Sequence, residues 1–230
     1  GGSLISTAVF RGVPVAELFR QAGGVQAEGG WLRLRSVDGY TESIPLSWAS
    51  DVNVMVAYAM NGESLTPAHG FPARLVVPGR FGLKSVKWLS AIEVSASDDP
   101  GYWTARGWSA EARVKTMSRI DVPGKGPRLA AAQGTLTVAV GGVAYAGSRG
   151  IARVELSDDG GRHWQSTLLE PALSPYTWVR WTWLWQSPLP GHHELIVRAV
   201  DGSSDIQDSR VQGELPDGAS GWHRLGVRIG

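Results

Sequence analysis

The chain has 230 residues, and 43% of them are hydrophobic, which is enough to build one large domain or two ordinary ones. The 22 Lys and Arg residues nearly balance the 21 Asp and Glu residues, so the net charge of +1 gives no general electrostatic reason to bind nucleic acid. The absence of Cys excludes disulfides and thiolate metal ligands within these residues.

The first 50 residues predict one amphipathic helix followed by extended segments. Pro14 suits the first turn of a helix, and Val15 and Leu18 follow at helical spacing. Two glycines at 23–24 then end this helix. From Trp31 onward apolar and polar residues alternate, as in a half-buried strand. The predicted elements are a helix over 15–22, a strand over 31–37, a turn over 38–40, an extended segment over 43–46 and a short helix over 47–50.

Strands and turns dominate the next segment, up to residue 95. Asn61-Gly62 is typical of a primed β-hairpin turn, because both residue types tolerate the positive φ that this turn requires. Pro78-Gly79 marks the end of another apolar run. The predicted strands cover residues 52–60 and 71–77, and the first of them is expected to be buried. Residues 86–95 are predicted to form a further strand or a segment that combines strand and helix.

A domain boundary is predicted between Ser97 and Pro127. Asp, Pro, Gly and Arg are frequent there and aromatic residues are scattered, which is typical of a linker. We therefore assign residues 1–110 to a first domain and residues 128–230 to a second, with the linker at about 97–127.

The second half predicts a β-sandwich of the immunoglobulin type. Short strands alternate with turns that contain Gly or Pro, and no helical period is present. One of these strands carries Trp181, Trp183 and Trp185 on a single face, which predicts a place in a core or in a subunit contact. The predicted strands cover residues 135–140, 151–156, 163–169, 178–185, 194–200 and 221–229.

Residues 69–88 combine features that suit a bound polyanion. They contain His69, an apolar run from Phe71, a turn rich in glycine and several cations. Glycine frees backbone N–H groups for a ligand, and the cations supply positive charge. An isolated histidine in such a turn would more often have no ligand role, and Lys84 and Lys87 could be ordinary solvated side chains.

Residues 69–88 also resemble the pterin-binding segment of the sulfite oxidase family of molybdenum enzymes. Matching motifs follow in the same order through most of the chain. They lie at residues 11–15, 43–46, 57–63, 159–164, 198–201 and 221–224. The resemblance implies a strand-rich α+β fold, in which part of a molybdopterin domain is followed by an immunoglobulin-like dimerisation domain. It also implies a molybdenum-dependent oxidoreductase, of a type that we expect to be bacterial.

The resemblance assigns cofactor contacts to particular residues. His69 and Arg74 match contacts of the pterin cofactor, and residues 85–87 (Ser85, Val86 and Lys87) match the loop that holds its phosphate end. A doubly charged phosphate is well served by a guanidinium or ammonium group together with backbone donors. Asp38, in the turn before Tyr40, matches less closely and is expected to accept hydrogen bonds from the pterin ring.

Substrate residues are also implied by the resemblance. Arg224 matches one arginine of the pocket that holds the oxyanion, although an arginine in a terminal strand is usually a surface residue. The family's pocket tyrosine is expected at Trp108, and an indole cannot supply a phenolic proton. Arg106 is a further cation that could face this pocket. The expected substrate is therefore sulfite, another small oxyanion or a sulfoxide.

The metal ligand is not expected within this chain. The family's molybdenum is bound by a cysteine thiolate, a soft ligand that suits this metal. In the family this cysteine lies in a loop just before the sequence that matches Gly1-Gly2. Because the chain also begins without an initiator Met, we expect it to be a fragment of a longer protein, inactive by itself, whose parent binds Mo-molybdopterin.

Further expectations concern partners and location. The resemblance implies a homodimer formed through the second domain and an electron-transfer partner of unknown identity. Relatives of this type often act outside the cytoplasm, so we expect an extracytoplasmic parent that could be anchored to a membrane through a preceding region. The rival interpretation is a non-enzymatic binding or assembly module, in which the tryptophans of the sandwich recognise a partner.

One motif of the second half invites a functional interpretation but is predicted to be structural. Residues 157–164 satisfy the Ser-x-Asp-x-Gly-x-x-Trp pattern of Asp-box hairpins. A single copy stabilises a β-turn through hydrogen bonds from the backbone to the Asp carboxylate and through packing of the Trp ring.

Overall fold

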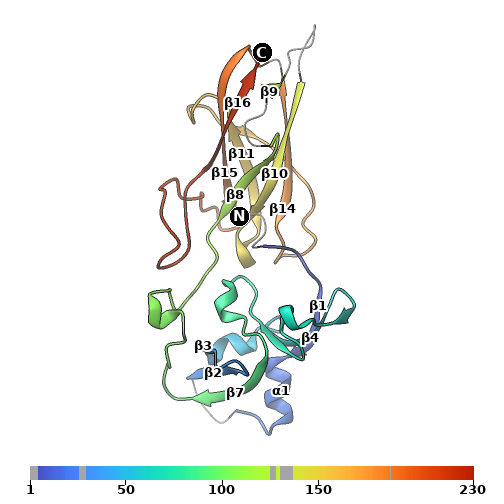
Figure 1. Cartoon of the computed structure of the whole chain (residues 1–230), viewed down its shortest axis with the longest axis vertical. Coiled ribbons are helices and arrows are strands. Elements are labelled where there is room, and N and C mark those ends of the chain that lie inside the picture. The colour runs from blue at the N-terminus through green and yellow to red at the C-terminus, as the bar shows by residue number, and fades with distance from the viewer. Residues whose placement is uncertain (1–4, 26–29, 125–127, 130–136, 187) are drawn as a thin grey trace. The chain divides into compact units, whose positions relative to one another are not determined.

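The computed structural model describes residues 5–25, 30–124, 128–129, 137–186 and 188–230. The predictions made for residues 1–3 and for strand residues 135–136 lie outside these ranges. The chain divides into two compact units, one of residues 1–113 with 215–217 and one of residues 114–214 with 218–230 (Figure 1). Among the described residues, no helix has the length and apolar character needed to cross a membrane.

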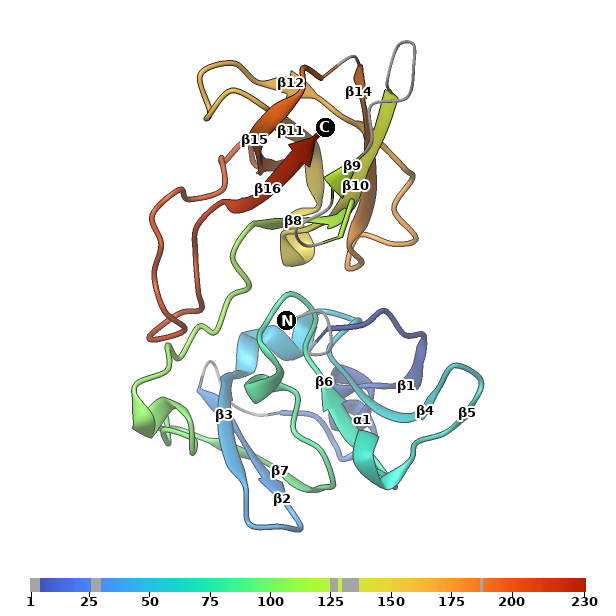
Figure 2. The ribbon, with the colours of Figure 1, turned by 45° about the horizontal axis from the view of Figure 1, so that its top comes forward.

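The first unit contains two small antiparallel sheets and short helices (Figure 2). One sheet consists of β1 (Phe10–Pro14), β4 (Met55–Met60), β5 (Glu63–Ser64) and β6 (Arg74–Val76). The other consists of β3 (Thr41–Pro45), β2 (Trp31–Ser36) and β7 (Leu89–Ser95). The helices are α1 (Val15–Gln21) and the 3-10 helices η1 (Leu46–Ser50), η2 (Pro67–His69), η3 (Gly82–Lys84) and η4 (Thr104–Arg106).

Alternation along β2 builds much of the first unit's core. Leu32 and Leu34 are fully buried, whereas Arg35 is exposed. They pack with other buried residues from β3, η1, β6 and α1, of which Val15 is the one fully buried member of that helix. The predicted helix, the strand at 31–36 and the short helix before Ser50 are therefore confirmed.

Two apolar runs of the first unit are shorter as strands than predicted. β4 begins only at Met55, and Val52 is 64% exposed, so residues 52–54 are not part of a buried strand. β6 begins at Arg74, since Gly70 adopts a φ of 100° at the end of η2 and Pro72 has no N–H for a strand ladder. The predicted turn at Asn61-Gly62 is confirmed, because both residues have positive φ and join β4 to β5.

The second unit is a sandwich of two sheets (Figure 1). One sheet has the order β13 (Leu168–Leu169), β14 (Val179–Gln186), β10 (Thr137–Tyr145) and β8 (Met117–Val122). The other has the order β12 (Gln165–Ser166), β11 (Ile151–Ser157), β15 (Gly191–Asp201), β16 (His223–Ile229) and β9 (Arg128–Leu129). The sandwich predicted from the sequence is confirmed.

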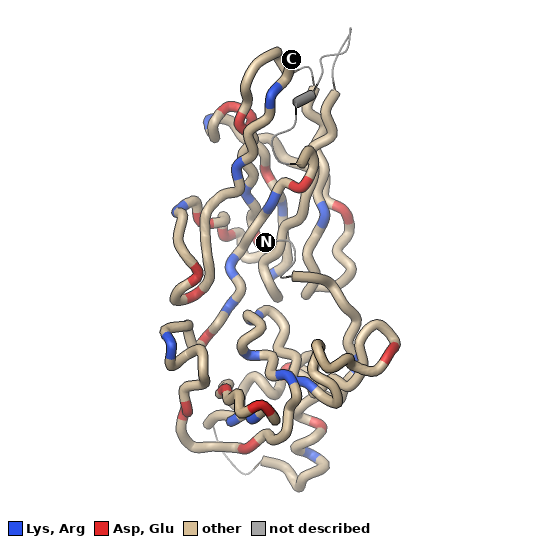
Figure 3. The backbone as a smooth tube through the Cα atoms, in the orientation of Figure 1, with Lys and Arg blue, Asp and Glu red and all other residues tan. Residues whose placement is uncertain are grey.

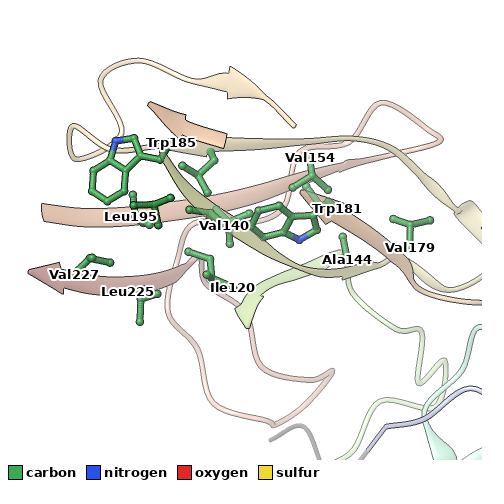
Figure 4. Packing of buried hydrophobic residues seen from close by; sticks show 14 of the residues in the cluster. Ile120, Val140, Ala144, Val154, Val179, Trp181, Trp185, Leu195, Leu225 and Val227 are labelled. Atoms are coloured by element: carbon green, nitrogen blue, oxygen red, sulfur yellow. The ribbon is translucent and has the colours of Figure 1, made fainter. Parts of the chain in front are cut away.

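The sandwich core is formed by residues of both sheets, and two tryptophans are its largest members (Figure 4). Trp181 is fully buried and Trp185 is 3% exposed, while Trp183 is partly buried and packs against the same cluster. The strand therefore places its indoles in a core, which was one of the two predicted destinations. Gly142 lies opposite Trp181 in the pairing of β10 with β14, and a Cβ atom there would lie 1.8 Å from the carbonyl oxygen of Arg119 in β8.

Two segments of the second unit differ from the prediction. The expected linker contains β8, which pairs with β10 and contributes Ile120 to the core. The run 163–169, predicted as one strand, is split into β12 and β13, and these belong to different sheets. Thr167 lies between them and bonds to Val154 through both its backbone N–H and its hydroxyl. A chain that crosses from one sheet to the other cannot keep a single ladder.

The Asp-box segment forms the predicted hydrogen-bonded turn. Asp159 Oδ1 accepts the backbone N–H groups of Arg162 and His163, each at 3.0 Å. These bonds, together with the His163 side chain, hold the pKa of Asp159 well below its usual range.

Charges of both signs are interspersed along both units (Figure 3).

Candidate functional site

The first unit contains a cleft of about 260 Å³. Its walls come from the turn between β2 and β3, from η3 with the residues that follow it, and from the chain just before η4. The lining residues are Ser36, Asp38, Tyr40, Gly82, Leu83, Ser85, Val86, Lys87, Trp88 and Trp103. Four residues that the sequence predicted as cofactor contacts, Asp38, Ser85, Val86 and Lys87, are therefore brought together in one cleft.

The turn between β2 and β3 supplies an anionic group. The carboxylate of Asp38 accepts the backbone N–H of Tyr40 at 3.0 Å. This bond, the hydroxyl of Ser36 and the positive charge of Lys87 lower the pKa of Asp38, so the carboxylate is ionised at neutral pH. An ionised carboxylate can accept hydrogen bonds from ring N–H groups of a ligand.

The wall after η3 is held by hydrogen bonds from β6 and from the residue that follows this strand. Leu75 N donates to the carbonyl of Val86 at 2.8 Å, and Val77 N donates to the hydroxyl of Ser85 at 3.1 Å. The exposed side chain of Lys87 donates to the carbonyl of Ala68 at 3.0 Å. These bonds place a hydroxyl and an ammonium group on the same short segment.

His69 and Arg74 lie beside this segment and not in the lining of the cleft itself. The guanidinium of Arg74 donates to the carbonyls of His69 and Ser85, both at 3.3 Å. Gly70 follows His69 in the chain, and a Cβ atom on Gly70 would be 3.0 Å from Cβ of Lys87 and 3.1 Å from Cβ of Arg74. Glycine at this position therefore leaves room for the side chains of both cationic residues to pack directly against the backbone.

Arg74 carries a charge that its surroundings do not neutralise. Among the described residues its hydrogen bonds go to backbone carbonyls, its guanidinium lies 5.5 Å from the centre of the Phe10 ring, and no carboxylate pairs with it. Burial lowers the pKa of this guanidinium. A half-buried cation without a counter-charge is a feature that an anionic ligand would stabilise.

Lys84 differs from the solvated lysine that the sequence allowed. Its side chain is 2% exposed and its Nζ atom lies 2.9 Å from Oε1 of Glu42, which is 1% exposed. Both charges of this pair are satisfied inside the protein. Lys84 is therefore not available to a ligand of the cleft, whereas Lys87 is.

The segment that includes η4 does not place its predicted residues in the cleft. Arg106 lies with its guanidinium 3.5 Å from the centre of the Tyr102 ring and donates to the Tyr102 carbonyl at 2.8 Å. Trp108 packs edge-on against Phe81, with ring centres 5.6 Å apart. Neither side chain lines the cleft, and the aromatic residue of this segment that does so is Trp103, which is 43% exposed.

Tyr40 is the functional candidate that the sequence analysis missed. It lines the cleft, and its hydroxyl lies 2.8 Å from the carbonyl of Leu83 and 3.3 Å from Oε2 of Glu42. Burial and the charge of Glu42 raise the pKa of Tyr40, so its phenol keeps its proton at neutral pH. The position of Tyr40, two residues after Asp38 in the same turn, was the signal in the sequence.

Arg224 belongs to the second unit and lies on β16. It forms an ion pair with Glu194 of β15, with 2.7 Å between Nη1 and Oε2, and both side chains are about half exposed. The structure thus places Arg224 in a surface ion pair, where the guanidinium remains accessible to solvent.

Comparison with known proteins identifies both halves of the chain. Residues 1–103 match the oxidoreductase molybdopterin binding domain, and residues 106–229 match the Mo-co oxidoreductase dimerisation domain. The chain belongs to the sulfite oxidase family of molybdopterin-dependent oxidoreductases. The family expected from the sequence is thereby confirmed, as is the Mo-molybdopterin cofactor of the proteins in this family.

Individual relatives agree with this assignment. The chain is 32% identical over 222 residues to a sulfite oxidase of Arabidopsis thaliana, which covers 83% of this chain and 56% of the plant protein. It is 31% identical over 263 residues to the mitochondrial sulfite oxidase of Homo sapiens, covering 98% of this chain and 47% of the human protein. The chain thus spans about half the length of these relatives.

A solved structure matches the fold of the chain. The sulfane dehydrogenase SoxCD of Paracoccus pantotrophus aligns with a TM-score of 0.78 and 26% identity, over 94% of this chain and 59% of that one. The residues of the cleft, together with Arg74 beside it, fit the phosphate and pterin parts of the cofactor by their chemistry. Arg74 and Lys87 are cations that form no ion pair with a carboxylate in the described structure, and Asp38 is an ionised acceptor.

Proposed function

We propose that the cleft of the first unit binds Mo-molybdopterin and that the full-length protein transfers an oxygen atom between water and a small oxyanion or a sulfoxide. The observation that carries this proposal is that Ser85, Val86 and Lys87 line the same cleft as Asp38, and that the guanidinium of Arg74, which has no paired carboxylate among the described residues, donates to the Ser85 carbonyl beside it. Membership of the sulfite oxidase family supports the same chemistry.

The residues of the chain act on the cofactor by binding and orientation. Arg74, Lys87 and the hydroxyl of Ser85 serve the phosphate end, since a phosphate gains most from cations together with neutral donors. Asp38 serves the pterin ring as an acceptor. When bound, the cofactor supplies the metal and the two-electron chemistry, and the protein supplies position and charge.

The substrate end of the proposal involves cationic and aromatic residues. For an oxyanion that is oxidised, water provides the added oxygen, and two protons and two electrons leave. Arg224 would provide positive charge for the anion, as the family resemblance implies. Within the first unit, the protonated phenol of Tyr40 lines the cleft, whereas Arg106 and Trp108 lie outside its lining. The relatives named above act on sulfite and sulfane, and both support a small sulfur compound as substrate.

The assembly and the dependence on other residues are part of the proposal. The match of the second unit to a dimerisation domain supports a homodimer formed through that unit, and the two electrons would pass to a separate partner. We also propose that this chain alone is inactive, because its 230 residues contain no Cys to bind the metal.

Pterin content tests the cofactor site directly. The full-length protein, expressed with sufficient molybdenum, should release about one oxidised, fluorescent pterin per chain. Arg74→Gln and Lys87→Met should each reduce that content several-fold, whereas Arg35→Gln, which breaks an exposed ion pair with Glu93 in the same unit, should leave it unchanged. A full pterin content in both cleft variants, or none in the unmodified protein, would contradict the proposal.

Metal analysis tests the inactivity of the chain alone. The isolated chain should contain little molybdenum and show no turnover of sulfite or of a sulfoxide, whereas the full-length protein should contain stoichiometric metal. Equal metal content and equal turnover in the two proteins would refute this part of the proposal.

A further inference from the structure

A buried ion pair lies beneath the cleft and has no role in the function proposed above. Glu42 is on β3 and Lys84 ends η3, and their side chains are 1% and 2% exposed. Oε1 of Glu42 accepts Nζ of Lys84 and the backbone N–H of Ser43, each at 2.9 Å. Nζ of Lys84 also donates to the carbonyl of Ser43 at 2.9 Å.

Glu42 is the point where three wall segments of the cleft meet. The first segment is the turn that leads into its own strand, where Tyr40 lies with its hydroxyl 3.3 Å from Oε2 of Glu42. The second is η3, which is tied to Glu42 by Lys84 and to Tyr40 by the bond from the phenol to the Leu83 carbonyl at 2.8 Å.

The third segment consists of residues 101–103, which carry Trp103 into the cleft. A Cβ atom on Gly101 would lie 2.5 Å from Oε1 of Glu42, so the absence of a side chain lets this backbone lie directly on the carboxylate. Tyr102 N donates to the carbonyl of Thr41 at 3.1 Å and holds the segment there. One carboxylate thus contacts or anchors every wall of the cleft.

The chemistry of the pair excludes two simpler roles. Its charges cancel, so it adds no net attraction for an anionic cofactor. A buried ion pair is also seldom more stabilising than apolar side chains of similar volume, because both ions lose their hydration. What the pair provides that apolar side chains cannot is a set of directed hydrogen bonds to Tyr40 and Ser43 and to each other.

We propose that Glu42 and Lys84 are positioning residues that hold the phenol of Tyr40 and the segment of residues 85–87 in register with each other across the cleft. This inference rests on the proposed function for its consequence, which is retention of the cofactor. Its structural content, the coupling of three wall segments through one buried pair, stands independently of any ligand.

Hydrogen exchange measured by mass spectrometry on the full-length protein tests the coupling. In Lys84→Met and in Glu42→Gln, peptides over residues 81–89 and 100–104 should exchange roughly tenfold faster. Peptides over 31–36 and over the second unit should keep their rates. Lys84→Arg, which keeps the charge and the donors, should retain most of the protection, and Arg35→Gln serves as the control for an exposed ion pair of the same unit.

The double variant Glu42→Leu with Lys84→Met separates positioning from stability. It leaves no unpaired charge, so its unfolding midpoint should return close to that of the unmodified protein. Exchange at 81–89 should nevertheless be as fast as in the single variants, and pterin content should be lower than in the unmodified protein, because the bonds to Tyr40 and Ser43 are still missing. A double variant with normal exchange and normal pterin content would overturn the inference, as would single variants in which exchange rises evenly through the whole unit.

The same measurements distinguish the inference from the function on which it rests. If the unmodified protein contains no pterin but the single variants show the localised rise in exchange, the cofactor proposal fails and the positioning role stands. If the unmodified protein contains pterin and the single variants retain it with unchanged exchange, the positioning role fails and the cofactor proposal stands.

Discussion

The two units of this chain bury their side chains in different ways. The second unit has long paired strands, and its core contains Trp181, Leu195 and other apolar residues from both sheets. The first unit has shorter strands joined by turns and 3-10 helices, and it buries both charges of the Glu42–Lys84 pair beside its apolar core. In the second unit, the buried carboxylate of Asp201 pairs with an arginine, Arg149, whose side chain is 11% exposed. The cleft lies in the first unit, among these turns and 3-10 helices.

This difference shows which kind of packing suits a binding site. Regular strands satisfy their backbone groups with each other and leave few donors for a ligand. The turn that carries Asp38 and the segment after η3 leave polar groups facing a cleft, and buried side chains such as Glu42 and Lys84 must then hold these irregular segments. The following predictions test this contrast, from the largest expected effect to the smallest.

Truncation of the central tryptophan should have the largest effect. Trp181→Ala removes a fully buried indole from between the two sheets and should lower the free energy of unfolding by about 3–5 kcal/mol. Urea denaturation followed by circular dichroism measures this loss. A change below about 1 kcal/mol would contradict the tight packing of Trp181 between the two sheets.

A buried carboxylate makes the second unit sensitive to acid. Asp201 accepts Nε of Arg149 at 2.6 Å and the hydroxyl of Thr116 at 2.9 Å. Burial by itself would raise the pKa of Asp201, but these hydrogen bonds outweigh it and the pKa lies below its usual value. The bonds therefore stabilise the fold fully above the unfolded-state pKa of about 3.9, and this stability is lost as the pH falls through the folded-state pKa.

Asp201→Asn tests that contribution. The variant should lose about 3 kcal/mol of stability at pH 7, since it leaves Arg149 without its counter-charge. As the pH falls below about 5, its stability should decrease less steeply than that of the unmodified protein, because the variant has no carboxylate to protonate at this position. Parallel pH profiles in the two proteins would contradict the assignment.

Gly101→Ala sharpens the contrast within the first unit. The new Cβ atom would lie 2.5 Å from Oε1 of Glu42 and 2.8 Å from its Cα, so the segment must move, at a cost of about 1–3 kcal/mol. Gly82→Ala is the matched control, because a Cβ atom there meets nothing within 4 Å, and its stability should change by less than about 0.5 kcal/mol. Equal denaturation midpoints for the two variants would show that Glu42 is not confined by its neighbours.

The two core indoles should differ in their response to phenylalanine. Trp185 Nε1 donates to Oδ2 of Asp158 at 2.8 Å, whereas Trp181 Nε1 has no hydrogen-bond partner within the described structure. Trp185→Phe loses a hydrogen bond to a charged group, worth about 1.5–3 kcal/mol, while Trp181→Phe removes an unpaired N–H along with the lost packing. Urea denaturation should therefore show a smaller loss of stability from hydrogen bonding for Trp181→Phe than for Trp185→Phe. In the Trp185→Phe background, Asp158→Ala should cause little further loss, because the hydrogen bond to the indole is already absent.

The smallest effect is expected at the surface. Glu194→Gln removes the partner of Arg224 in an ion pair whose side chains are about half exposed, so stability should change by no more than about 1 kcal/mol and less at high salt. If Arg224 serves the substrate as proposed, the variant should still alter kcat/KM for an anionic substrate in the full-length protein. Steady-state kinetics at two salt concentrations measure that change.

Local patterns in the sequence determined much of the second unit and part of the first. The helix after Pro14, the buried leucines of β2 and the Asn61-Gly62 turn depend on neighbours within a few residues, so propensity and periodicity were sufficient to predict them. The same holds for Trp181 and Trp185, whose spacing along one strand places both on its inner face. The role of residues 85–87 was expected from the resemblance to the sulfite oxidase family, and the structure places these residues in the lining of the cleft.

Tertiary structure alone decided which residues of the site meet. Lys84 looks like a surface lysine in the sequence, and only its contact with Glu42, 42 residues earlier, makes it a buried ion. Tyr40 lines the cleft because its hydroxyl donates to the Leu83 carbonyl of η3, and Trp108 stays outside because it packs on Phe81. Each of these outcomes depends on partners far apart in the chain, and local spacing carries no information about which distant segments come into contact.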